Sequence, residues 1–191
     1  MSQEDGLKER LMTLKEFTRK YLSTSSCRLV WPLEKSPLTS TQSSIAYLAQ
    51  HPLFEQIPDL LHDIELPSLC GEGGPSNVNA WIGTGGTRTP CHFDTYDNLL
   101  VQIVGAKYIR CFHPNQSNKL YVMKDTDSSY GKQGNMSALN CEMEDYDLHP
   151  LAKDATYSET VLFPGDCLYI PSGHWHYVRS CSTSASVNFW F

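Results

Sequence analysis

The chain has 191 residues, of which 40% are hydrophobic, and its formal net charge is -6 at pH 7. This length allows one sizeable core and is too short for two ordinary domains, so a single domain is expected. The acidic balance disfavours broad binding to nucleic-acid phosphates, and a basic polypeptide is the better match for a partner. No apolar run approaches the roughly 20 residues that span a bilayer, and the polar stretch 1–10 does not have the pattern of a secretory signal, so no membrane association is expected.

The first 76 residues have a helical and irregular pattern, and we expect them to flank the core. Apolar residues at helical spacing predict an amphipathic helix over 6–22, with Asp5 placed to cap its first turn. The stretch 23–44 is rich in Ser, Thr and Pro and predicts a loop. Apolar residues at helical spacing recur from Leu53 to Ile64, and because Pro58 must start or break a helix there, a short helix is expected near 58–63.

From residue 77 onward the pattern changes to short runs of β-branched and aromatic residues separated by turn signals. These runs predict strands at 78–82, 98–104, 107–112, 160–163, 167–170, 176–179 and 185–191. Gly105-Ala106 has the length of a hairpin turn, and Pro164-Gly165-Asp166 predicts another turn. Many short strands without intervening helices indicate a mainly β sandwich or jelly roll, a class that includes the cupins.

The cysteines and the acidic segment each have an ordinary interpretation. Seven cysteines are scattered without a Cys-x-x-Cys spacing, which disfavours a disulfide framework and a tetrathiolate zinc site and indicates reduced thiols in an intracellular protein. The densest acidic stretch, with Glu142, Glu144, Asp145 and Asp147, lies in a polar segment from about 124 to 156. It is interpreted as a solvated loop, and substrate contact is the alternative.

A His-Phe-Asp triplet at positions 92–94 is the strongest chemical signal. In an extended strand residues i and i+2 point to the same side, so His92 and Asp94 can reach one ion. Two imidazoles and one carboxylate on one face of an octahedron leave the opposite face open, as a non-haem iron site requires. The third ligand is His174 or His176, which periodicity alone does not separate.

Lys107 opens an otherwise apolar strand and has two interpretations. It is either a solvated strand end or an inward ammonium that would bind the far carboxylate of a dicarboxylic co-substrate. Thr89 and Asn98 could supply hydrogen bonds to the same ligand. Trp81 and Trp190 lie on predicted strands, where core packing is the default and a dry wall around a metal site is the alternative.

Three segments resemble the JmjC (Jumonji C) oxygenases, namely Thr89–Asp94, Asn98–Arg110 and Pro171–Val178. Within that family, Tyr47–Pro58 and Lys107–Arg110 are similar to the subgroup of Jumonji-domain-containing protein five, also called lysine demethylase eight. The resemblance covers residues 11–191, which is almost the whole chain.

The resemblance implies a double-stranded β-helix, a cupin-like jelly roll, with a flank of N-terminal helices at 1–76 and a JmjC core at 77–191. It implies Fe(II) bound by His92, Asp94 and His176, with 2-oxoglutarate and O2 as co-substrates. It assigns the distal carboxylate of 2-oxoglutarate to Lys107, further contacts to Tyr47, Thr89 and Asn98, a pocket wall to Trp190, and no ligand role to His174. From periodicity alone Tyr47 would be a packing residue.

The implied activity is that of a dioxygenase that hydroxylates a protein side chain, as an arginyl hydroxylase or a histone methyl-lysine demethylase. The expected partner is a basic protein or peptide of histone or ribosomal type, and the expected location is the nucleus, with the cytoplasm as an alternative. Phe93, Tyr96 and Asp97 depart from the glutamine-rich run of the subgroup. These departures motivate a second hypothesis, a catalytically silent cupin scaffold that binds protein partners. Nucleic-acid oxidation is a third hypothesis, which the acidic balance disfavours.

Overall fold

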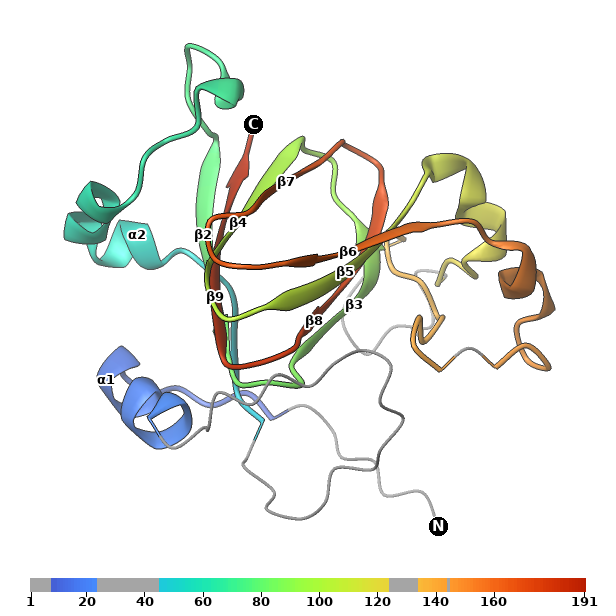
Figure 1. Cartoon of the computed structure of the whole chain (residues 1–191), viewed down its shortest axis with the longest axis horizontal. Helices are drawn as coiled ribbons and strands as arrows, with labels where there is room; N and C mark the ends of the chain where they lie inside the picture. The colour runs from blue at the N-terminus through green and yellow to red at the C-terminus, as the bar shows by residue number, and fades with distance from the viewer. Residues whose placement is uncertain (1–7, 24–44, 124–133, 144) are drawn as a thin grey trace.

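Two antiparallel sheets face each other in the computed structural model, which describes residues 8–23, 45–123, 134–143 and 145–191 (Figure 1). The strands are β1 Tyr47–His51, β2 Asn77–Gly83, β3 Arg88–Phe93, β4 Asn98–Val104, β5 Lys107–Phe112, β6 Ser158–Leu162, β7 Cys167–Ile170, β8 Trp175–Ser180 and β9 Ser184–Trp190. Their order is β1-β2-β9-β4-β7 in one sheet and β3-β8-β5-β6 in the other. This mainly β, two-sheet arrangement is consistent with a jelly roll and confirms the predicted fold class.

All seven predicted strands are present: β4, β5 and β7 have the predicted bounds, and the ends of β2, β6, β8 and β9 are shifted by one or two residues. The turn between β4 and β5 contains Gly105 at a φ of +73°, a conformation that L side chains rarely adopt. A Cβ at this position would lie 2.1 Å from the carbonyl oxygen of Thr183, so the turn requires glycine. Neither β3, which was considered only as a possible extended stretch around His92, nor β1 was among the predicted strands. For β1 the structure shows the reason. Its register is irregular between Leu48 and His51, and Gln50 has a φ of +45°, which breaks the alternation that marks a strand.

The predicted helix at 6–22 is wrong in its start and in part of its type. The α-helix α1 spans Leu14–Phe17 and continues as the π-helix η1, Thr18–Leu22. It begins there because Thr13 and Glu16 form a capping box, in which Thr13 Oγ1 accepts from Glu16 N and Glu16 Oε2 accepts from Thr13 N. Leu11 is exposed and adds nothing to a buried helix face. The predicted cap Asp5 and most of the predicted 23–44 loop lie outside the described residues.

The remaining helical turns are short. They are α2 Leu53–Gln56 and the 3-10 turns η2 Pro58–Asp63, η3 Ser68–Cys70, η4 Pro114–Lys119 and η5 Pro150–Asp154. The turn η2 confirms the helix predicted near 58–63, and its first residue is the proline that was expected to start it. No helix in the described ranges combines the length and the apolar character that a membrane crossing needs.

The two faces of the four-stranded sheet bury different kinds of side chain. On the outer face, Tyr108, Trp175 and Tyr177 form an apolar cluster with side chains of the segment that follows η4, such as Leu139. On the inner face, Lys107 on β5 and His176 on β8 line a pocket between the sheets. The strand alternation therefore places the apolar packing outside and polar groups inside.

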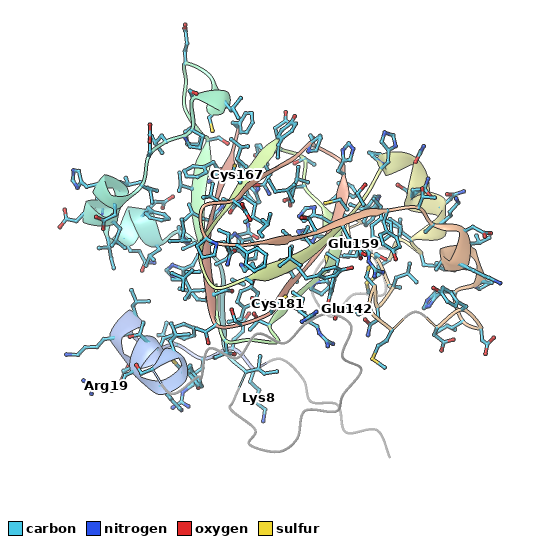
Figure 2. All side chains as sticks on the ribbon, viewed as in Figure 1. Lys8, Arg19, Glu142, Glu159, Cys167 and Cys181 are labelled. Carbon is cyan, nitrogen blue, oxygen red and sulfur yellow. The ribbon has the colours of Figure 1, made fainter. Side chains whose placement is uncertain are left out.

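The acidic segment was interpreted as a solvated loop, and this interpretation is wrong for Glu142. Glu142 is half-buried, accepts a hydrogen bond of 2.6 Å from Arg179 Nε and lies 3.8 Å from Arg88. Figure 2 shows Glu142 and Glu159 beside the four-stranded sheet. Asp147 is exposed, and Glu144 lies outside the described residues. Glu142 thus ties the segment to the outer face of the sheet.

Candidate functional site

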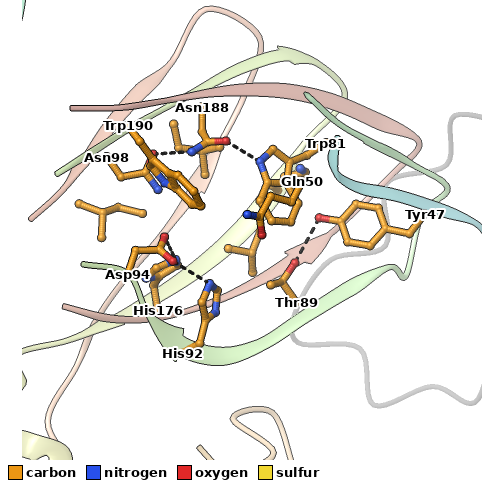
Figure 3. Close-up of a pocket in the computed structure, with 14 residues that line it drawn as sticks. Tyr47, Gln50, Trp81, Thr89, His92, Asp94, Asn98, His176, Asn188 and Trp190 are labelled. Atoms are coloured by element: carbon orange, nitrogen blue, oxygen red, sulfur yellow. Dashed lines mark hydrogen bonds and ion pairs between the residues drawn. The ribbon is translucent and has the colours of Figure 1, made fainter. Parts of the chain in front are cut away.

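His92, Asp94 and His176 lie together at one end of the pocket (Figure 3). The antiparallel pairing of β3 with β8 sets His92 directly opposite His176, and Asp94 follows β3. His92 Nε2 lies 3.8 Å from Asp94 Oδ1, and His176 Nε2 lies 3.7 Å from Asp94 Oδ2. The potential ligand atoms of the three residues all lie within 4.8 Å of one another. One ion could therefore be bound by all three side chains.

Both imidazoles present the nitrogen that a metal needs. His92 Nδ1 lies 2.8 Å from the carbonyl oxygen of Pro90, and His176 Nδ1 lies 3.1 Å from that of His174. A carbonyl oxygen only accepts, so each Nδ1 carries the proton and each Nε2 of a neutral ring keeps its lone pair. Burial, and then the neighbouring His92, lower the pKa of His176 to about 3, which keeps this ring neutral. Burial raises the pKa of Asp94. Two neutral imidazoles and a carboxylate fit the donor set of a facial Fe(II) site.

His174 does not join this cluster. It precedes β8, and its ring lies 5.2 Å from that of His113 in an edge-on contact. It also lines a separate cavity on the β6–β7 side of the barrel. Periodicity left His174 and His176 as equal candidates for the third ligand because it treated both as part of one extended strand. The turn at Ser172-Gly173 removes His174 from the strand.

Lys107 points into the pocket, so its interpretation as a solvated strand end is wrong. Its side chain is 1% exposed, and no carboxylate of the described residues lies within ion-pair distance of its ammonium. The ring centroid of Tyr47 lies 5.9 Å from Nζ. Burial lowers the pKa of Lys107 to about 7. A buried cation without a partner carries a large desolvation penalty, which an anionic ligand would offset.

Tyr47 and Thr89 reach the same pocket from β1 and β3. The Tyr47 hydroxyl lies 3.1 Å from Thr89 Oγ1, and either atom can be the donor. Burial raises the pKa of Tyr47 to about 12, so its hydroxyl keeps its proton at neutral pH. Because β1 belongs to the flank 1–76, the flank supplies a pocket residue and the edge strand of the larger sheet.

The pocket also contains residues that the sequence did not indicate. Asn98 and Trp190 line it as expected, and Trp190 Nε1 is buried without a hydrogen-bond partner among the described residues. Trp81, for which core packing was the default, is part of the wall. The residues that sequence reasoning missed are Gln50, Leu100, Ile170, Val178 and Asn188. Asn188 could have been found from its parity, since it stands two residues before Trp190 on one strand. The pocket with its open mouth has a volume of about 420 Å³.

Comparison with known proteins agrees with this geometry. A family described as a cupin-like domain matches residues 2–191. JmjC domain-containing protein F of Dictyostelium discoideum is 43% identical over 96% of this chain and 42% of its own length. Lysine-specific demethylase 8 of Xenopus tropicalis is 42% identical over 96% of this chain and 38% of its own length.

The chain belongs to the JmjC family of cupin-like domains. Jumonji C domain-containing protein 5 of Drosophila melanogaster is a further relative, 39% identical over 82% of this chain and 39% of its own length. This JmjC chain therefore spans less than half the length of these relatives. The matched family includes the flank, in keeping with the contribution of β1 to the pocket.

Proposed function

We propose that this JmjC chain is an Fe(II)- and 2-oxoglutarate-dependent dioxygenase that hydroxylates a protein side chain. The observation that carries the proposal is that Lys107, buried and without a carboxylate partner among the described residues, lies in the same pocket as the cluster of His92, Asp94 and His176. A metal site alone would suit many functions. A metal site and an ammonium in the same pocket suit a dicarboxylic ligand, in which one carboxylate binds the metal and the other binds the ammonium.

In this proposal each pocket residue has a role. His92, Asp94 and His176 hold Fe(II), and Lys107 binds the distal carboxylate of 2-oxoglutarate. Tyr47 and Thr89, already hydrogen-bonded to each other, would bind that carboxylate with Lys107, and Asn98 would donate to the metal-bound end. Trp190 forms the wall and limits access of water. The bound metal and its co-substrates supply the oxidation of a carbon–hydrogen bond, and the protein supplies position and a dry site.

The net charge of the chain and the names of its relatives support a proposal for the substrate class. The net charge of -6 favours a basic protein or peptide, such as a histone or a ribosomal protein. A relative named as a lysine-specific demethylase supports methyl-lysine as one target, and arginine is the other. We place the activity in the nucleus, on chromatin, with the cytoplasm as the second location. Mass spectrometry of a treated peptide separates the reactions, because hydroxylation adds one oxygen and demethylation removes a methyl group.

The direct test is an anaerobic titration of the chain with Fe(II) and 2-oxoglutarate, followed by the visible metal-to-ligand charge-transfer band of the chelate. We expect the band in the wild type and a weaker band at equal ligand concentration in Lys107→Ala. Lys153→Ala is the matched control, because Lys153 is exposed on η5 and its removal changes the net charge equally. Iron binding without a band would reject the oxygenase and leave a cupin scaffold that binds protein partners.

A further inference from the structure

Three polar side chains on adjacent strands form a hydrogen-bonded relay in the wall of the pocket. Trp81 Nε1 on β2 donates to Asn188 Oδ1 on β9 over 2.7 Å. Asn188 Nδ2 donates to Asn98 Oδ1 on β4 over 3.1 Å. Figure 3 shows the relay running along one side of the pocket, above the metal cluster. Asn188 is 1% exposed, so water does not compete for its amide.

The chemistry of the indole fixes the direction of this relay. An asparagine amide can be turned by 180° with little change in shape, so shape alone does not orient it. An indole nitrogen, in contrast, only donates. Asn188 must therefore turn its oxygen to Trp81 and its amino group to Asn98. Asn98 must in turn direct its oxygen to Asn188, which leaves its own amino group as the free end.

The amino group of Asn98 is the free end of the relay, and it is available to donate to a ligand in the pocket. Asn98 lines the pocket, and within the described part of the chain its Nδ2 has no hydrogen-bond partner. A reversed Asn98 would set its amino group against that of Asn188 and would show an oxygen to the pocket. Such an orphaned buried pair is costly. The pocket thus presents an N–H donor at Asn98 and an ammonium at Lys107.

We propose that Trp81 and Asn188 are positioning residues, which lock Asn98 as a hydrogen-bond donor and so select a ligand that offers a carboxylate oxygen at this point. The proposal rests on the proposed function, because 2-oxoglutarate is the ligand in question. It also explains two features that packing does not require, a tryptophan N–H directed at an amide and a fully buried asparagine opposite an apolar strand residue. Leu100 is the partner of Asn188 in the β4–β9 register.

The test compares the affinity for 2-oxoglutarate in variants that reverse, loosen or spare the relay. Asn188→Asp accepts from both neighbours, so it draws the amino group of Asn98 away from the pocket. Trp81→Phe removes the donor that fixes the orientation of Asn188, retains an aromatic though smaller side chain and leaves the charge unchanged. Asn79→Asp is the matched charge control, because Asn79 lies opposite Asn188 in the β2–β9 register and its Nδ2 has no hydrogen-bond partner among the described residues.

Calorimetry of the Mn(II)-loaded chain, without turnover, measures the Kd for 2-oxoglutarate and, separately, the Kd for Mn(II). We expect Asn188→Asp to weaken 2-oxoglutarate binding about 30-fold, as the loss of a hydrogen bond to a charged group implies. Trp81→Phe should weaken it only about 3-fold, because Asn98 can still adopt the donor orientation when the two asparagines are free to turn. We expect Asn79→Asp to have a clearly smaller effect than Asn188→Asp. The affinity for Mn(II) should change little in all three variants, whereas general damage to the fold would weaken both affinities.

Equal losses in Asn188→Asp and Asn79→Asp would show an effect of charge alone and overturn the relay. If Asn188→Asp does not fold, as judged by circular dichroism, Trp81→Phe decides, and an unchanged affinity there overturns the relay. A wild type that binds Mn(II) and no 2-oxoglutarate would reject the proposed function and the relay together. If the wild type binds 2-oxoglutarate and Asn188→Asp binds it equally tightly, the relay is rejected and the proposed function stands.

Discussion

Each face of the four-stranded sheet buries a cation, and the two cations differ in what surrounds them. On the outer face, Arg179 is 6% exposed and donates to Glu142 over 2.6 Å. On the inner face, Lys107 is 1% exposed and has no carboxylate within ion-pair distance among the described residues. Both lie at the same end of the sheet, since Lys107 pairs with Ser180, the neighbour of Arg179. A buried charge with its partner supplied by the chain stabilises the fold, whereas one without a partner marks a place for a ligand.

The largest expected effect is at the metal cluster on the inner face, where Asp94 is the one carboxylate among the described residues that line the pocket. Asp94→Ala removes the carboxylate that both histidines face. We expect loss of Fe(II) binding and of substrate-linked succinate formation, with the thermal unfolding of the metal-free chain little changed. Succinate measured by mass spectrometry and bound iron measured by absorption check this. Undiminished turnover would remove Asp94 from the ligand set.

Lys107→Met sharpens the contrast between ligand binding and stability. It keeps most of the side-chain volume and removes the ammonium. We expect the affinity for 2-oxoglutarate to fall roughly 100-fold, which is the range for removal of one partner of a buried charge pair. The free energy of unfolding without ligand should stay equal or rise, because an unpaired buried charge is gone. Chemical denaturation and calorimetry give the two quantities, and a large loss of stability would contradict the assignment.

Glu142→Gln is the reciprocal change on the outer face. It leaves Arg179 buried with a neutral partner, and we expect the free energy of unfolding to fall by about 2 kcal/mol, at the lower end for a half-buried ion pair. The affinity for 2-oxoglutarate should be unchanged, because Glu142 lies on the other side of the sheet. Asp147→Asn, an exposed change in the same segment, is the control. Weaker binding in Glu142→Gln without loss of stability would reverse the comparison.

The smallest effect is on the pH dependence of stability. Burial holds the pKa of folded Lys107 at about 7, below the usual lysine value of 10.5. Between these two values the unfolded chain binds more protons, so the stability of the ligand-free wild type rises with pH relative to that of Lys107→Met. From pH 6 to 8 the difference should grow by on the order of 1 kcal/mol. Denaturation at several pH values measures it, and parallel curves would show that Lys107 is not buried as a free cation.

Runs of β-branched and aromatic residues between turn signals predict seven of the nine described strands, and the period of two of an extended chain predicts the histidine–aspartate spacing. His92 and Asp94 had to share a side once the stretch was extended, and they do. The same period does not tell the inner face from the outer face when both are buried. For this reason Lys107 and Trp81 kept two interpretations in the sequence, and Asn188 was not noticed. The resemblance to JmjC oxygenases, rather than periodicity, singled out Tyr47.

Two of the errors in local structure have local causes. The helix α1 starts at Leu14 because Thr13 and Glu16 cap it, and apolar spacing upstream of Thr13 gave a false extension. The strand β1 escaped notice because Gln50 interrupts its alternation with a positive φ. In both cases a single cap or a single backbone torsion sets the end or the regularity of an element. A hydrophobicity pattern averaged over many residues does not detect such a local feature.

The position of Tyr47 on β1 links the ordering of the flank to the occupancy of the pocket. A ligand that contacts Tyr47 binds the state in which β1 is paired with β2, and mass action then stabilises that pairing. Backbone amides of β1 should exchange their hydrogens more slowly when 2-oxoglutarate is bound, while those of β5 and β8, already deep in a sheet, should change less. Hydrogen exchange in the edge strand β1 would thus measure the occupancy of the pocket by 2-oxoglutarate.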